Sequence, residues 1–286
     1  MAVDAGHLNA ELAGLDDLER AVTPPPPAAA RVWSALWPKL TAIGIVVAAW
    51  QVLVWTHWKT PYVLPGPRVV LPELLREIRK GLIFKAVRLT MRRALVGYAM
   101  ALVVGMLLGI VVSRVSFLRR AFGSLITGVQ TMPSIAWFPL AILFFKLSEG
   151  AILAVVVLGA APSIANGVIS GVDHIPPLLL RSGRMLGASG IQLYRHVILP
   201  AALPSFIGGL KQGWAFAWRS LMAGELLVII PGHLSLGVLL QQGRDNTDAP
   251  ALLSAMIVIL VIGIAVDSLF SVADGAVRRR WGLLAR

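Results

Sequence analysis

The sequence predicts an all-α, polytopic membrane protein: a helical bundle with six transmembrane helices. Of its 286 residues, 57% are hydrophobic and only 14% are charged, and the apolar residues lie in blocks rather than at amphipathic spacing. A block of about 20 apolar residues is long enough to cross a bilayer as a helix. The predicted spans are 40–58, 90–112, 125–145, 152–169, 206–230 and 252–272.

The net charge of +12 would suggest a nucleic-acid partner in a soluble protein. Here the basic residues lie at the ends of apolar blocks, where membrane orientation and anionic lipid headgroups account for most of the charge, so no nucleic acid is expected. Cysteine is absent, which excludes disulfides and thiolate metal sites. The histidines are scattered without metal-binding spacing, and no pairing of a nucleophile with a base indicates an enzyme.

Composition and charge divide the chain into four regions. Residues 1–39 form a cytoplasmic N-terminal tail, partly disordered because it is acidic and then rich in proline. Residues 40–88 form the first span and an outer amphipathic connection. Residues 89–275 form a core of five further spans, and residues 276–286 form a basic cytoplasmic tail.

Basic residues predict the orientation in the membrane. An even number of spans places both termini, the short loop 114–120 and the central segment 171–204 on one side, and the arginines of that side indicate the cytoplasm. The connection 59–88 is also basic, although six spans place it outside. It is either an outer rim that attracts an anion or an interfacial helix whose cations reach the headgroups.

Small and helix-breaking residues indicate how the spans pack. Gly97, Gly105 and Gly109 predict close helix contacts in the second span. The third span is interrupted by Pro133, which marks a helix that lines a cavity or is buried in protein. Polar residues in the third and fourth spans either line a translocation path or bind backbone carbonyls freed by proline; they are Gln130, Thr131, Ser134 and Asn166.

Three ionisable residues lie within the fifth span, where they are costly unless they face protein or water. Lys211 is expected to extend towards the headgroups. Arg219 either binds an anion with its two-pronged donors or takes part in a structural ion pair, with Glu225 as one possible partner. Glu225 is expected to serve gating or packing, and both residues complete the candidate path.

The central segment RSGRMLGASGIQLYRHVILPAALP (181–204) resembles the cytoplasmic signature of ABC-importer permeases of the type I fold. That signature has Glu-Ala-Ala, then a glycine, then Ile-x-Leu-Pro. Gly187 takes the place of the glycine and 197–200 takes the end, whereas Arg181 stands where the family is usually acidic. The resemblance implies a cytoplasmic coupling helix over about 184–196. It assigns ATPase coupling to Arg181, Arg184, Gly187, Ala188, Tyr194, Arg195, Leu199 and Pro200.

Resemblance extends from about residue 63 to the C-terminus. The stretches YVLPGPRVV, MPSIAWFPLAILFF and GASGIQLYRHVILPAALPSFIGGLK are similar to the nitrate, sulfonate and taurine branch of these permeases. This implies a homodimer, two cytoplasmic ATPase subunits and an external solute-binding protein. The chain has no G-x-x-x-x-G-K-[ST] phosphate loop, so ATP and magnesium are expected in the ATPase partner and this chain itself binds no cofactor.

The expected function is therefore the translocation step of an ATP-driven importer in the cell membrane. A small anionic solute, such as an aliphatic sulfonate, taurine or nitrate, would move inward by alternating access. Bicarbonate and a pyrimidine vitamin precursor are the alternative cargoes. Two other classes stay open at this point: an ion-gradient-driven transporter, and a membrane scaffold whose docking segment is degenerate.

Overall fold

The computed structural model describes residues 28–280, and all of its regular secondary structure in that range is helical. It divides into two compact units, Met1–Lys59 and Thr60–Arg286. The predictions for residues 1–27 and 281–286 lie outside the described residues. The described part of the first unit centres on helix α2 (Ala28–Trp55), which contains most of the first predicted span. Within this unit its apolar side chains from residue 37 onward are largely exposed.

The second unit consists of helices joined by short turns. Two short elements lie between the α-helices, the 3₁₀ turn η1 (Ser134–Trp137) and the π-helical turn η2 (Tyr194–Ile198). The α-helices are α3 (Pro67–Arg79), α4 (Leu82–Arg114), α5 (Ser116–Thr131), α6 (Phe138–Phe145), α7 (Glu149–Asp173), α8 (Pro177–Met185), α9 (Gly190–Leu193), α10 (Leu199–Leu227), α11 (Leu236–Asp245) and α12 (Ala249–Arg280).

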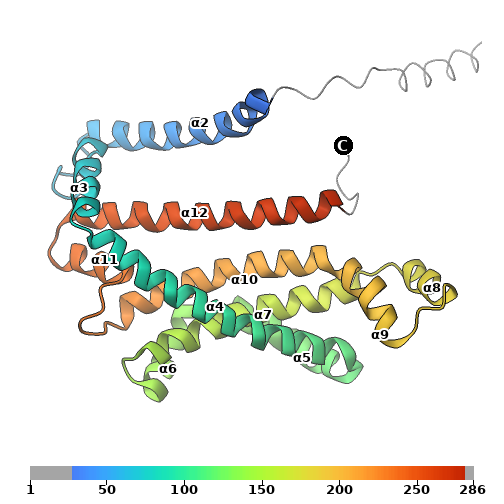
Figure 1. The fold of residues 1–286 in the computed structure, drawn as a ribbon. Coiled ribbons are helices and arrows are strands. Elements are labelled where there is room, and N and C mark those ends of the chain that lie inside the picture. Colours follow the sequence, from blue (N-terminus) through green and yellow to red (C-terminus); the bar gives the residue numbers. More distant parts are fainter. Residues whose placement is uncertain (1–27, 281–286) are drawn as a thin grey trace, which may run out of the picture. The chain divides into compact units, whose positions relative to one another are not determined.

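Helix α7 is the centre of this unit and packs against both α4 and α10 (Figure 1). Glycines make the approach close. A Cβ atom added to Gly105 of α4 would lie 2.7 Å from the carbonyl oxygen of Ala161 in α7, and one added to Gly209 of α10 would lie 2.6 Å from the Cα of Gly167. Gly97 and Gly109 meet α7 in the same way. The predicted packing role of the second-span glycines is thus confirmed.

The third predicted span is a bent pair of helices. The first part, Phe117–Thr131, and the second, Ser134–Phe145, meet at 101°, and Pro133 stands at the break. Proline cannot continue the preceding helix, because its ring excludes the α conformation from the residue before it. The predicted loop at 114–120 is wrong: α4 ends at Arg114, α5 begins at Ser116, and a single residue separates them.

Four helices in the described range are long and apolar enough to cross a membrane, and there are five if the bent pair counts as one span. They are α2, α4, α7 and α12. Helix α10 covers most of the predicted fifth span and is 29 residues long, but it is not among them. Its polar residues, including Lys211, Gln212 and Arg219, lower its hydropathy.

The amphipathic helix predicted in the connection between the first two spans is α3, which packs against α12. Its carboxylate at Glu77 is close enough to Glu73 and Asp248 for repulsion. Partial burial and these two negative charges raise the pKa of Glu77 above its usual value of 4.5. Helix α3 therefore carries an acidic group that holds its proton more tightly in the folded protein than in the unfolded chain.

Candidate functional site

The segment between α7 and α10 is built around the glycine that the sequence singled out. The amide of Ala188 donates to the carbonyl of Gly183 at 3.0 Å, and the amide of Gly187 donates to the carbonyl of Arg184 at 3.0 Å. Gly187 itself has φ +84°. These are the two hydrogen bonds and the left-handed residue of a Schellman motif, which ends a helix.

The expected single helix over 184–196 is therefore wrong. A left-handed residue cannot continue a right-handed helix, so α8 ends at Met185 and the chain turns before the next helix begins. That helix begins with α9 and continues through the π-helical turn η2 into α10 without a break. Single π turns within α-helices are frequent at functional sites.

The three residues at the Glu-Ala-Ala place have separate roles in the fold. Gly183 is buried, and a Cβ atom there would lie 2.9 Å from the Val197 Cγ2 and 3.2 Å from the Leu193 Cδ1. A small residue is required at this place because α8 packs on α9 and η2 there. Arg181 is exposed and forms no ion pair within the described residues, so the basic substitution does not disturb this packing.

Large apolar side chains project from the turn and from the start of α9. Met185, Leu186 and Ile191 are 86%, 87% and 84% exposed. They were not predicted from the sequence, although the large apolar pair Met185 and Leu186 directly before Gly187 was a usable signal. Of the predicted coupling residues, Arg184, Tyr194, Arg195 and Leu199 are exposed, while Ala188 and Pro200 are half-buried. This surface suits contact with another protein.

The candidate translocation residues are only partly brought together. Asn166 of α7 donates from its Nδ2 to the Oε1 of Gln130 in α5 at 2.6 Å. Thr131 and Ser134 follow Gln130 at the bend, and the hydroxyl of Thr131 donates to the carbonyl of Gly128 at 2.8 Å. The Asn166–Gln130 pair therefore places two amide groups between α7 and the bent span.

The ionisable residues Lys211, Arg219 and Glu225 of α10 have different partners from those that the sequence predicted. The Lys211 Nζ lies 3.1 Å from Asp267 and donates to the hydroxyl of Ser271 at 2.9 Å, so Lys211 joins α10 to α12 instead of extending alone to the headgroups. Arg219 is exposed, and its guanidinium lies 5.8 Å from the centre of the Phe216 ring. It forms no pair with Glu225, whose partner is a different arginine.

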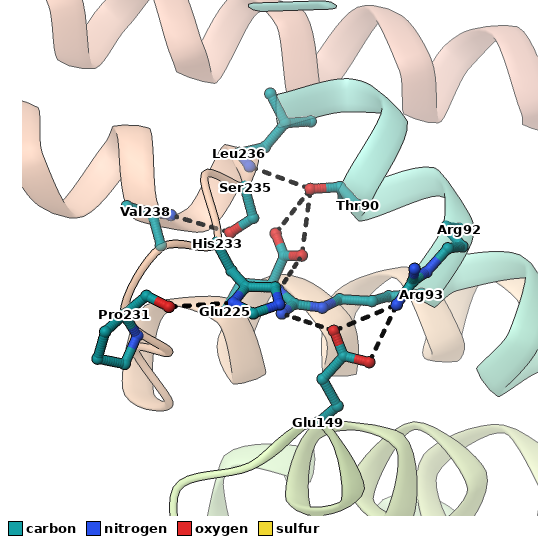
Figure 2. A network of polar contacts seen from close by, with 10 residues as sticks. All are labelled: Thr90, Arg92, Arg93, Glu149, Glu225, Pro231, His233, Ser235, Leu236 and Val238. Carbon is teal, nitrogen blue, oxygen red and sulfur yellow. Dashed lines mark hydrogen bonds and ion pairs between the residues drawn. The ribbon is translucent and has the colours of Figure 1, made fainter. Parts of the chain in front are cut away.

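Figure 2 shows that partner, Arg93 of α4. The Arg93 Nη1 donates to the Glu225 Oε1 at 3.1 Å, and the Arg93 Nη2 lies 3.3 Å from the Glu149 Oε1 at the start of α7. Arg93 is 3% exposed and the Glu225 side chain is not exposed at all. Arg92 reaches Glu149 from the outer side at 3.2 Å. The network thus joins α4, α7 and α10.

The same carboxylate also holds the beginning of α11. The Thr90 hydroxyl donates to Glu225 and accepts the amide of Leu236 at 3.0 Å, while the amide of Gly237 donates to the Glu225 Oε2 at 3.2 Å. The first amides of a helix have no partner within the helix and attract negative charge. A Cβ atom on Gly237 would lie 2.3 Å from the Glu225 Cβ, so glycine is needed for this approach.

Arg93, Thr90 and Glu149 were not predicted from the sequence. The available signal was the pair Arg92 and Arg93 inside the second predicted span, because an ionisable residue within a span usually has a polar partner in the protein. The partner itself is 132 residues away along the chain, which no local pattern indicates. Glu225 is fully buried here, so this structure gives it a packing role and no exposed surface on a path.

The described residues form an all-helical bundle with a membrane-type composition and a protruding segment between two long helices, as in a polytopic membrane protein. Residues 101–281 match the family model described as "Binding-protein-dependent transport system inner membrane component". The chain belongs to this family: it is the inner-membrane, multi-pass permease component of a binding-protein-dependent ABC transporter, and not its catalytic subunit. This finding confirms the resemblance noted in the sequence and favours an ABC permease over a gradient-driven transporter.

Curated relatives include permeases of named transport systems. The chain is 24% identical over 243 residues to the taurine transport system permease protein of Escherichia coli, which covers 81% of this chain and 87% of the relative. It is also 24% identical over 246 residues to the nitrate import permease protein of Synechocystis, with 82% and 87% covered. Both matches extend over most of each chain.

Solved structures show the same fold. A chain of the MetNI methionine ABC transporter in an inward-facing conformation matches with a TM-score of 0.60 and 22% identity, covering 70% of this chain and 98% of that one. A chain of an amino acid ABC transporter matches with a TM-score of 0.53 and 16% identity, covering 72% and 98%. At these identities the likeness concerns the fold.

Proposed function

We propose that this permease acts as a homodimer with two cytoplasmic ATPase subunits and an external solute-binding protein, and imports a small anionic solute by alternating access. The observation that carries the proposal is the exposed segment from α8 to η2. Its large apolar side chains Met185, Leu186 and Ile191 are exposed, and the Schellman turn at Gly187 determines the path of the backbone that carries them. An ATPase groove that covers these side chains would receive and transmit movement through this segment.

Membrane topology follows from this assignment. The coupling segment must face the ATPase, so both termini are placed in the cytoplasm and α10 is the sixth span together with α2, the bent pair, α4, α7 and α12. The length of α10, 29 residues, suffices to cross a bilayer of about 30 Å. Its lower hydropathy is tolerable where its polar side faces the partner permease or a wet path.

The proposed cargo is an aliphatic sulfonate, taurine or nitrate-like anion. Two observations support this class: curated relatives are named for taurine and nitrate, and Arg219 offers an exposed guanidinium on α10. A planar guanidinium matches the oxygens of sulfonate or nitrate with two parallel donors. The amides of Gln130 and Asn166 are further neutral donors for an oxyanion. Bicarbonate is the alternative anion, and a pyrimidine precursor would have no need of Arg219.

The coupling proposal is tested with a glycine pair. Gly187 and Gly81 both have positive φ, +84° and +73°, and open space around the Cβ position. Tryptophan at either place therefore brings a similar backbone strain, but only Gly187 lies in the coupling segment. We expect Gly187→Trp to abolish ATPase co-purification or transport-coupled ATP hydrolysis, and Gly81→Trp to retain both. Equal effects of the two variants would contradict the assignment.

The cargo proposal is tested by uptake of radiolabelled taurine, nitrate and bicarbonate into proteoliposomes that contain the whole transporter. Loss of one charge-assisted contact is expected to reduce uptake of the true cargo about tenfold or more in Arg219→Gln. The control is Arg120→Gln, which removes an exposed arginine of α5. Undiminished uptake in Arg219→Gln would remove Arg219 from the path.

A further inference from the structure

A second binding site lies beside the coupling segment. An open cavity of about 710 Å³ is lined by the last turns of α4 and α7, by α9 and η2, and by the first turns of α10. This volume is within the range of about 300–1,000 Å³ that is usual for ligand sites. Tyr194, Arg195 and Leu199 of the coupling segment contribute to its lining, but the proposed transport cycle places no ligand in this cavity.

The lining of the cavity changes from apolar to basic along its length. One end is formed by Met106 and Phe206, the middle by aliphatic side chains such as Ile110 and Leu203, and the other end by Arg114 and Arg195. From Met106 to Arg114 helix α4 rises roughly 12 Å. The cavity therefore offers an apolar channel with two guanidinium groups at its mouth.

The two arginines are available to a ligand. The Arg114 guanidinium lies over the ring of Tyr194 at 5.2 Å, which fixes its position and leaves its donors open. Neither Arg114 nor Arg195 has a carboxylate partner within the described residues. The nearby Asp173 at the end of α7 is engaged by Arg119 instead. A strong positive charge thus remains at the polar mouth of an apolar cavity.

We propose that this cavity binds an anionic phospholipid, with an acyl chain against the apolar lining and the phosphate between Arg114 and Arg195. The proposal rests on the orientation given under the proposed function, which places these arginines at the cytoplasmic headgroup level. Basic pockets between membrane helices at this level are suited to anionic headgroups. A small hydrated anion such as the proposed cargo would gain nothing from the long apolar lining, whereas an amphiphile matches both ends.

The lipid would also affect coupling. Helix α8 packs on the Leu193 and Val197 side of α9 and η2, while the neighbouring Tyr194 and Ile198 face the cavity. An acyl chain in the cavity would support η2 from the membrane side and hold the coupling segment in place against α10. Anionic lipid would therefore increase the fraction of ATP hydrolysis that is linked to transport.

The test uses the complete transporter in nanodiscs of neutral phosphatidylcholine with anionic phosphatidylglycerol, and native mass spectrometry counts the lipids retained by each permease. We expect retention of the anionic lipid to fall about fivefold for Arg114→Gln or Arg195→Gln and about thirtyfold for both. Arg120→Gln, which removes the same charge outside the cavity, should retain it. Ser113→Trp, which fills the mouth of the cavity without removing charge, should also lose the lipid.

Several results would overturn the lipid site. The first is equal retention of neutral and anionic lipid, and the second is retention of the anionic lipid by the double variant. The third is the absence of bound lipid because a segment of the ATPase or of the second permease fills the cavity. ATPase co-purification is recorded in the same samples. Absence of lipid selectivity in the unmodified transporter with an intact complex contradicts the lipid site alone, whereas selective lipid binding without ATPase binding contradicts the proposed function alone.

Discussion

The buried pair of Arg93 and Glu225 gives the sharpest prediction for stability. Both side chains are almost completely withdrawn from solvent, with 3% and 0% exposure, and their charged atoms are 3.1 Å apart. Removal of Arg93 leaves Glu225 as a buried charge without an ion-pair partner, which costs about 3–5 kcal/mol. We expect this loss in the free energy of unfolding for Arg93→Met, and a loss at the lower end of that range for Glu225→Leu, because Arg93 then keeps its ion pair with the partly exposed Glu149.

The double variant distinguishes this reasoning from simple loss of packing. Arg93→Met combined with Glu225→Leu removes both charges and leaves unpaired only neutral groups, the Thr90 hydroxyl and the Gly237 amide, at about 1–3 kcal/mol. The double variant should therefore be more stable than either single variant. In thermal unfolding of the purified permease, the single variants should lower Tm by roughly 6–20 °C.

The exposed half of the network supplies the control. Arg92 and Glu149 are 64% and 34% exposed, and an ion pair of that exposure contributes less than about 1 kcal/mol. Arg92→Gln should therefore change Tm little. If the costs of the two buried single changes simply add in the double variant, Arg93 and Glu225 are not energetically coupled, and the argument from buried charge is wrong.

Three further changes test the packing, the acidic group on α3 and a strained turn. Gly209→Ala should destabilise the permease, because its Cβ would lie 2.6 Å from the α7 backbone, whereas Gly208→Ala meets nothing within 4 Å and should be neutral in the same unfolding assay. Glu77→Gln should increase stability at neutral pH. The pKa of Glu77 is raised in the folded protein, so the wild type loses stability as the pH rises from 4.5 through the folded-state pKa. A difference in Tm between the two proteins that does not change with pH over that range would contradict this prediction. Thr247→Gly should stabilise by about 1 kcal/mol, since a β-branched residue with φ +53° is strained, and a lower Tm would show that the threonine side chain has a compensating role.

Sequence alone determined the class of this protein. A block of apolar residues can be recognised within one segment. Because a bilayer accepts only segments whose backbone hydrogen bonds are made internally, such blocks predict membrane helices, and the helical membrane bundle was predictable. The glycines of the second span marked a close helix contact, because residues without a side chain let two helix backbones approach. The place of Gly187 in a recurrent motif revealed the coupling segment. Its conformation was less predictable, because the Schellman turn divides a segment that was expected to be one helix.

The tertiary structure decided which polar residues meet. Glu225 and Arg93 are 132 residues apart in the chain, and only the packing of α4 and α10 on α7 brings them together. Arg219 and Glu225 are six positions apart on α10, so they do not lie on the same face of the helix. The packing of the bundle then buries Glu225 and leaves Arg219 exposed. Ion pairs and cavities depend on the relative positions of helices that are distant in the sequence. Burial and close contact between helices determine these positions, and the periodicity of a single segment does not encode them.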